Sequence, residues 1–214
     1  MSRGLTPIVA RSAFVVLIAL AVAYLAYIRP ANMRWGASDV EVTRPMPGDW
    51  IVRDATFNAT RAVTIDARPD QVWPWIVQMG TGRGGFYGYD WIDRAGLASA
   101  EDILPQYQSP EAGDVVPSST DARTGYLVKG FQPNHYMLWL ARTPRLTWCW
   151  ELRPIGPDRT RLVTRVRFRH PWRSFAIFTA LATDVGDTIL MPKCMLGIKA
   201  RAEALARKVH KPLP

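Results

Sequence analysis

The sequence predicts an α+β domain in which an antiparallel sheet packs against a long C-terminal helix, with one apolar membrane helix in front of it. Three observations predict this plan: an uncharged apolar run near the N-terminus, a series of strand-like segments in the centre, and apolar residues at helical spacing near the C-terminus. The apolar face of such a sheet has only the terminal helix to pack against.

Length and composition limit the class of protein. A chain of 214 residues suits one domain rather than two full cores, and 48% hydrophobic with 21% charged residues argues against disorder. Two cysteines, Cys149 and Cys194, are too few for a disulfide framework or a cysteine-only zinc site. The net charge of +9 admits an anionic partner, either nucleic acid or a membrane surface.

The apolar run covers residues 12–28, after an N-terminal tail of residues 1–11. As a helix it is about 25 Å long, enough for a thin bilayer core, and Tyr24 and Tyr27 suit the interface at its second end. A cleaved signal peptide is one alternative, because Ala21–Ala23 fits a cleavage site, and a buried soluble helix is another. We favour an uncleaved transmembrane helix, because the apolar run continues beyond that site and has no polar face.

The basic residues on the two sides of this helix nearly balance, so they do not orient it. The two cysteines favour a cytoplasmic domain on a single-pass protein of the cell membrane, because thiols persist in the cytoplasm. Residues 29–52 contain several prolines and glycines without periodicity, which predicts an irregular linker near the membrane. The globular domain is then expected over residues 53–210, followed by a tail of residues 211–214.

Within the domain, residues 70–79 and 87–97 are predicted helices. Pro74 is tolerable in the first of them if Asp70 caps that helix. Alternating or β-branched composition, with turn residues between several segments, marks the predicted strands at residues 58–66, 113–117, 125–131, 135–141, 145–153 and 159–170.

The last element is an amphipathic helix beginning near Met191. Its apolar positions recur at spacings of three and four residues, with charged residues on the other side. Pro192 either kinks the helix or lies in its first turn. The preceding apolar run, residues 175–182, is too short to span a membrane and is predicted to end at Asp184 and Asp187.

Three segments resemble the SRPBCC superfamily, which includes START lipid-transfer domains and polyketide cyclases: Ile65–Gly80 (IDARPDQVWPWIVQMG), Gly84–Trp91 (GGFYGYDW) and Met195–Glu203 (MLGIKARAE). The resemblance covers residues 55–210. It implies a helix-grip fold, a curved antiparallel sheet around the C-terminal helix that encloses an apolar cavity. It implies no single reaction, because the superfamily holds carriers, sensors and enzymes.

Residues 80–85 (GTGRGG) match the dinucleotide-binding pattern G-x-G-x-x-G. That function needs the glycines at a strand-to-helix turn in a parallel βαβ unit, whereas here they follow a predicted helix and precede consecutive strands. A loop between helices is therefore favoured over a nucleotide site. Arg83 in this loop is a candidate for binding an anionic head group.

Aromatic and methionine side chains are the candidates for binding a ligand. Trp148 and Trp150 are two residues apart on one strand, so they face the same side of the sheet. Two interpretations stay open for the whole set, ordinary core packing or the wall of a cavity for a flat or greasy molecule. The set comprises Tyr87, Tyr89, Trp91, Trp139, Trp148, Trp150, Met191 and Met195.

Asp90 and His135 are the candidates for acid–base chemistry, provided that they come within hydrogen-bond reach of a reacting group. Each also has a structural interpretation, His135 as a satisfied histidine in a strand and Asp90 as a partner of the glycine loop. The sequence lacks the zinc and serine-hydrolase motifs, so no metal and no cofactor are expected. Cys149 lies between tryptophans and is predicted to be buried and inert.

Arg161, Arg165, Arg167 and Arg169 share one face of the last predicted strand. A solvated outer face is the favoured interpretation, and contact with anionic lipid is the alternative. No nucleic-acid partner is expected, because no nucleic-acid-binding module is recognisable.

These observations predict a membrane-anchored protein that binds a hydrophobic small molecule or lipid in an internal cavity, as a carrier or sensor. One alternative is an enzyme resembling polyketide cyclases or dehydratases that uses Asp90 or His135. A regulatory interaction module without a ligand is the other.

Overall fold

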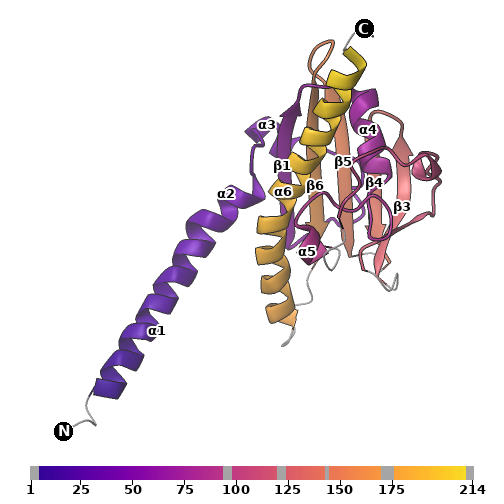
Figure 1. Cartoon of the computed structure of the whole chain (residues 1–214). Helices are drawn as coiled ribbons and strands as arrows, with labels where there is room; N and C mark the ends of the chain where they lie inside the picture. The colour runs from indigo at the N-terminus through magenta and orange to yellow at the C-terminus, as the bar shows by residue number, and fades with distance from the viewer. Residues whose placement is uncertain (1–4, 94–97, 120–123, 143–144, 170–175, 211–214) are drawn as a thin grey trace.

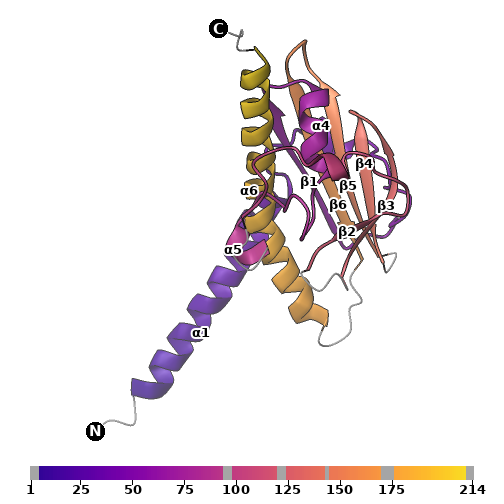
Figure 2. The same ribbon diagram turned by 45° about the vertical axis from the view of Figure 1, so that its right-hand side comes forward.

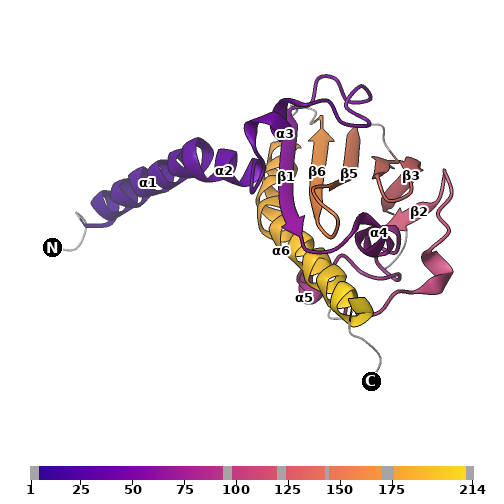
Figure 3. The ribbon, with the colours of Figure 1, turned by 90° about the horizontal axis from the view of Figure 1, so that it is seen from above.

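The computed structural model describes residues 5–93, 98–119, 124–142, 145–169 and 176–210 (Figure 1). A six-stranded antiparallel sheet, in the order β1-β6-β5-β4-β3-β2, curves around a long C-terminal helix, and an apolar N-terminal helix extends away from it. Seen from above, helices α4 and α6 lie on the concave side of the sheet (Figure 3). This arrangement confirms the predicted α+β helix-grip fold.

The strands correspond to the six predicted ones, with ends that differ by at most two residues. They are β1 (Phe57–Ile65), β2 (Val115–Pro117), β3 (Gly125–Gln132), β4 (Tyr136–Ala141), β5 (Leu146–Pro154) and β6 (Thr160–Phe168). The helices are α1 (Leu5–Ala23), the π-helical turn η1 (Tyr24–Ile28), α2 (Arg29–Met33), α3 (Asp39–Thr43), α4 (Pro69–Val77), α5 (Asp90–Asp93), the 3₁₀ turn η2 (Pro105–Tyr107) and α6 (Ala176–His210).

Helix α6 is longer than predicted. It runs without interruption from Ala176 to His210, through both aspartates that were expected to end the apolar run and through Pro192 in its interior. Asp184 and Asp187 can lie within the helix and away from its ends, because each carboxylate pairs with an arginine of another element. The helix axis changes direction along its length (Figure 2). Pro192 accounts for the bend, because it has no N–H to donate to the preceding turn.

The start of helix α4 also differs from the prediction. The N-cap is Arg68, whose backbone N–H donates to Gln71 Oε1 at 3.0 Å. Asp70 lies inside the first turn and pairs with the Arg68 side chain at 2.9 Å, so it is not the cap. Pro74 is consequently inside the helix, further from its start than expected.

Elements α1, η1 and α2 follow one another as a single rod that leaves the domain (Figure 1). Its segment Arg11–Met33 is long and apolar enough to cross a membrane, with a mean hydropathy of 2.0 and none of its most apolar window buried. The helical segment therefore extends beyond the predicted residues 12–28 at both ends.

The predicted linker is not an irregular tether. After α2, residues 34–52, here called the strap, lie across the convex face of the sheet (Figure 3). The strap contains helix α3, at whose start the Ser38 backbone N–H donates to Glu41 Oε2 at 2.8 Å and the Glu41 N–H donates to Ser38 Oγ at 3.3 Å. Met46 is buried in a cluster with apolar side chains of the sheet. The folded unit therefore begins well before residue 53.

Arginines of β6 hold the strap in place, which corrects the prediction of a solvated or lipid-facing basic surface. Arg161 Nε donates to Glu41 Oε1 at 2.7 Å, and Arg165 Nη1 donates to Asp49 Oδ2 at 2.7 Å. Arg165 is 3% exposed. Arg169, at the end of the row, remains exposed. Most of this basic face is therefore neutralised by acidic residues within the same chain.

The Glu41 pairing makes stability depend on pH. The hydrogen bond from Arg161 holds the pKa of Glu41 at about 2, against 4.5 for the free group. A lowered pKa stabilises the folded state at pH values above 4.5, and this contribution is lost as the pH falls from 4.5 to 2. Over that window we expect the wild type to lose about 2–3 kcal/mol more than Glu41→Gln.

Urea unfolding of the full chain in non-ionic detergent, repeated at several pH values, measures this difference. Asp54→Asn is the matched control, because the Asp54 carboxylate is 79% exposed and 3.5 Å from its partner Arg169. Parallel pH profiles for the wild type and Glu41→Gln would contradict the pairing.

Candidate functional site

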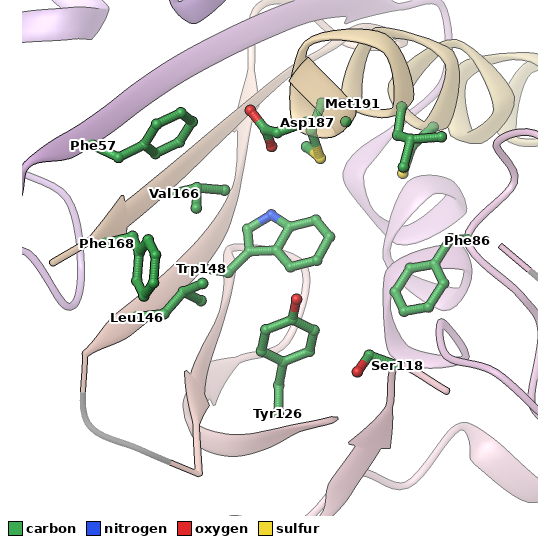
Figure 4. A pocket seen from close by; sticks show the side chains of 13 residues that line it. Phe57, Phe86, Ser118, Tyr126, Leu146, Trp148, Val166, Phe168, Asp187 and Met191 are labelled. Carbon is green, nitrogen blue, oxygen red and sulfur yellow. The ribbon is translucent and has the colours of Figure 1, made fainter. Parts of the chain in front are cut away.

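An apolar cavity of about 400 Å³ lies between the concave face of the sheet and the first half of α6 (Figure 4). This volume falls within the range of small-molecule sites, roughly 300–1,000 Å³. Its walls come from strands, from α6 and from the loops beside them. The lining residues are Phe57, Phe86, Ser118, Tyr126, Leu146, Trp148, Val166, Phe168, Gly186, Asp187, Leu190, Met191 and Cys194.

The register of the sheet assembles the wall of the cavity. Phe168 pairs with Phe57 on one side and with Leu146 on the other, so three apolar side chains form a row across β1, β6 and β5. Two residues further along, Val166 pairs with Trp148 and continues the same face. The cavity therefore lies at the end of the sheet where β1 and β5 begin and β6 ends.

The opposite wall is helix α6 together with the loop before α5. Met191 and Cys194 contribute apolar surface, and at Gly186 an added Cβ would meet nothing within 4 Å. The Phe86 ring stacks on Trp148 with centroids 6.3 Å apart and planes 9° apart. Tyr126 meets the same indole edge-on at 5.4 Å. Flat aromatic surfaces on two sides of the cavity suit an apolar ligand.

Asp187 and Tyr126 bring polar atoms to this apolar space (Figure 4). Asp187 Oδ2 accepts a hydrogen bond from Arg61 Nη2 at 2.5 Å, and no residue in the described part of the chain donates to its Oδ1. Burial raises the pKa of Asp187, and Arg61 opposes that shift. Burial likewise raises the pKa of Tyr126 to about 12, so its hydroxyl stays protonated.

Sequence reasoning missed Asp187 as a site residue. The sequence pattern predicts that Asp187 ends an apolar run, because a charged residue commonly marks a solvated boundary. One signal was available: Asp187 lies four residues before Met191, so a continued helix places both on the same face.

The structure divides the predicted ligand-binding aromatics and methionines into three groups. Trp148 and Met191 line the cavity. Trp139, Trp150 and Met195 are fully buried, and each of these two indoles lies 5.1 Å from Trp148, centroid to centroid. These three residues pack in the core next to the cavity wall.

The aromatics between 87 and 91 lie outside the lining. Tyr87 is buried, and its hydroxyl donates to the carbonyl of Trp75 at 2.9 Å. The ring of Tyr89 lies 5.8 Å from Lys193 Nζ on the outer side of α6. Trp91 is 73% exposed. These residues fasten the loop to α6 or face outward.

Arg83 lies in the glycine loop, which follows helix α4 and closes with paired backbone hydrogen bonds between Gly80 and Gly85. Its guanidinium donates to the carbonyls of Val77 at 3.0 Å and Val115 at 3.3 Å. Burial lowers the pKa of Arg83. The side chain thus ties the loop to its neighbours, and the loop lacks the strand-to-helix setting of a dinucleotide site.

The two acid–base candidates are not brought together in the cavity. Asp90 Oδ1 accepts from Ser99 Oγ at 2.6 Å at the start of α5. His135 is exposed in the turn before β4, where its carbonyl accepts from the Leu152 N–H, at the far end of β5 from the cavity. Its Nδ1 lies 3.0 Å from Gln132 Oε1.

Neither Cys149 nor a cluster of metal-ligating side chains is found at this site in the described part of the chain. Cys149 is buried on the convex face of the sheet, and burial raises the pKa of its thiol. Among the described residues, no group of three or more histidine, cysteine, aspartate or glutamate side chains is placed to hold a metal ion.

Comparisons with known proteins concern the fold. No model of a protein family matches the sequence, and no curated protein does. Three similar solved structures illustrate the likeness. A polyketide cyclase-like protein from Corynebacterium glutamicum is 16% identical (71% of this chain, 90% of that chain, TM-score 0.36). A START superfamily protein from Mycobacterium smegmatis is 10% identical (71% and 98%, TM-score 0.37), and a protein from Rhodobacter sphaeroides is 14% identical (69% and 93%, TM-score 0.45).

Proposed function

We propose that this protein binds a hydrophobic small molecule or lipid in the cavity between the sheet and α6, as a membrane-anchored carrier or sensor. The observation that carries the proposal is the cavity itself, about 400 Å³ in volume and lined mainly by apolar side chains. Binding would come from removing apolar ligand surface from water, at about 25 cal/mol per Å². A module whose interior is filled by its own side chains would not leave this space.

The direction of the apolar rod supports supply of the ligand from a membrane. The Trp35 carbonyl accepts from the Ala62 N–H, whereas Arg29 lies over the ring of Phe57, 6.0 Å from its centroid. The rod therefore runs alongside β1. Its α1 end lies on the same side of the domain as the end of β1 that lines the cavity. We propose that α1 enters the bilayer on this side, as a single-pass anchor with the domain in the cytoplasm.

Filling the cavity tests the proposal. Gly186→Leu adds a side chain where the structure has free space, so we expect the variant to fold and to lose at least tenfold in ligand affinity. The full chain is prepared from carbonate-washed membranes, in which an anchored protein is retained. Native mass spectrometry then compares the non-covalent mass carried by the wild type and the variant.

Leu196→Phe is the matched control, because it adds volume on an exposed part of the same helix. It should carry the same ligand as the wild type. Equal ligand mass on the wild type and Gly186→Leu would overturn the cavity as the binding site, as would a wild type that stays free of ligand with every lipid offered.

An acid–base enzyme is the second candidate, and one observation favours it: Asp187 is a carboxyl group with a raised pKa that lines the cavity. Such a group can move a proton to or from a bound molecule. Asp187→Asn separates the two functions. A carrier converts no ligand in either form, whereas an enzyme forms product that disappears in the variant.

A further inference from the structure

The cavity end of the sheet, where β1 and β5 begin and β6 ends, carries three arginines with exposed side chains. Arg142 and Arg145 lie between β4 and β5, and Arg169 directly follows β6. The Arg169 N–H donates to the carbonyl of Arg145 at 2.9 Å, so these two backbones are neighbours. We call the three arginines the basic rim.

The basic rim borders the sheet wall of the cavity. Arg145 directly precedes Leu146 and Arg169 directly follows Phe168, and both of these apolar residues line the cavity (Figure 4). A surface that contacts the rim is therefore brought next to the cavity.

The basic rim keeps a positive charge in the folded chain. The described ion pairs give it one carboxylate, that of Asp54, which lies 3.5 Å from Arg169 and is 79% exposed. Three guanidinium groups thus face one carboxylate. Arg161 and Arg165, within β6, are instead neutralised by acidic residues of the strap. The rim is therefore free to attract an anionic partner.

Helix α5 brings an exposed aromatic side chain to the same end of the domain. It lies beside α6, on the side towards which α1 leaves the domain (Figures 1 and 2). Trp91 on α5 is 73% exposed, and the preceding Asp90 accepts a hydrogen bond from Ser99. Exposed indoles of this kind are favoured at the interface between a bilayer and water.

The apolar rod sets how close this end comes to a bilayer. Arg29 is the first charged residue after the apolar run of the rod, and it pairs with Asp184 of α6. From Asp184, α6 extends back to Ala176, about two turns, towards the end of the domain at which the rod leaves (Figures 1 and 2). A bilayer that holds the rod up to Arg29 therefore lies against the cavity end.

We propose that the cavity end of the domain docks on the surface of the bilayer that α1 enters. The basic rim contacts the phosphate groups of anionic phospholipids, and Trp91 lies in the interface. Guanidinium groups suit phosphate, and each arginine at an anionic surface strengthens docking about fivefold. This inference rests on the membrane anchor of the proposed function. It adds a second membrane contact, which holds the edge of the cavity against lipid.

Hydrogen exchange of the full chain, measured by mass spectrometry, tests the docking. The chain is placed in nanodiscs of phosphatidylcholine alone or of phosphatidylcholine mixed with phosphatidylglycerol. We expect amide exchange in peptides that cover residues 140–146 to be at least fivefold slower in the mixed lipid. The turn between β5 and β6 lies at the opposite end of the sheet and should exchange equally in both.

Charge removal separates the rim from the rest of the surface. The double variant Arg142→Gln with Arg145→Gln should lose the difference between the two lipids. Arg207→Gln with Lys208→Gln is the matched control, because it removes the same charge from exposed residues at the other end of α6 (Figure 1). This control should behave like the wild type.

The aromatic contact does not depend on lipid charge. Trp91→Ala should therefore speed exchange at the rim in both kinds of nanodisc. Trp50→Ala is its control, because Trp50 is 62% exposed in the strap, on the convex face of the sheet. It should leave exchange at the rim unchanged.

The outcomes separate the docking from the anchor. If carbonate removes the chain from membranes, the anchor fails and the inference fails with it. If the chain is retained but the rim exchanges equally in both lipids, the inference alone is overturned. It is also overturned if the arginine double variant keeps the lipid difference, or if both ends of the sheet slow equally.

Discussion

Replacing Arg165 with leucine is expected to lower the free energy of unfolding by about 3–5 kcal/mol. The guanidinium of Arg165 pairs with Asp49 at 2.7 Å and donates to three backbone carbonyls of the strap, those of Glu41, Val42 and Arg44. Leucine fills part of the space but leaves the carboxylate and the carbonyls without their donor. An uncompensated buried charge costs more than the pair itself contributes.

Urea unfolding of the full chain in non-ionic detergent, followed by tryptophan fluorescence, measures this loss. Arg169→Leu is the matched control directly after the end of the same strand. Its pair with Asp54 is 3.5 Å long, and the side chains of Arg169 and Asp54 are 61% and 79% exposed. Exposed pairs contribute under about 1 kcal/mol. Equal losses in the two variants would show that the strap does not depend on Arg165.

Adding one methyl group at Gly197 is expected to destabilise the fold by about 3 kcal/mol. The Cβ of an alanine there would lie 2.1 Å from the carbonyl oxygen of Tyr87 and 2.7 Å from its Cβ. Gly197 is where helix α6 comes closest to the loop before α5 that carries Tyr87, here called the aromatic loop. Neither backbone can move there without disturbing the buried Tyr87 ring. Thermal unfolding of Gly197→Ala, monitored by circular dichroism, should show a clearly lower midpoint.

Gly186→Ala in the same helix is the comparison, because its Cβ would meet nothing within 4 Å. Alanine is favoured over glycine in a helix by about 0.5–1 kcal/mol, so this variant should be as stable as the wild type or slightly more stable. Similar midpoints for the two alanine variants would mean that α6 does not contact the aromatic loop through Gly197.

The strap gives the apolar N-terminal helix a defined position on the domain. Arg29 and Arg61 fasten the end of the rod to α6 and β1, and the arginines of β6 fasten the residues that follow. A flexible tether would let the cavity point in any direction. With this attachment the direction of the cavity relative to α1 is set by the fold.

The six strands, the α+β plan and the apolar N-terminal helix could be predicted from local patterns in the sequence: alternation along a strand, turn residues such as Pro133 and Asn134, helical spacing at the C-terminus, or an uncharged run. The helix-grip arrangement was implied by the family resemblance of residues 55–210 and not by these patterns. Local patterns are set by the backbone geometry of each element. They also placed Trp148 and Trp150 on one face of the sheet correctly.

Only the tertiary structure decided the role of the strap, the extent of α6 and the composition of the cavity wall. Glu41 pairs with Arg161 across 120 residues, and Asp187 pairs with Arg61 across 126 residues. From the sequence alone, a charged residue is interpreted as exposed to solvent, because the residue that it pairs with can be identified only in the folded structure. The same holds for the aromatics: sequence placed Trp139 and Trp148 in the sheet, but only three-dimensional packing determines which indole is covered and which borders empty space.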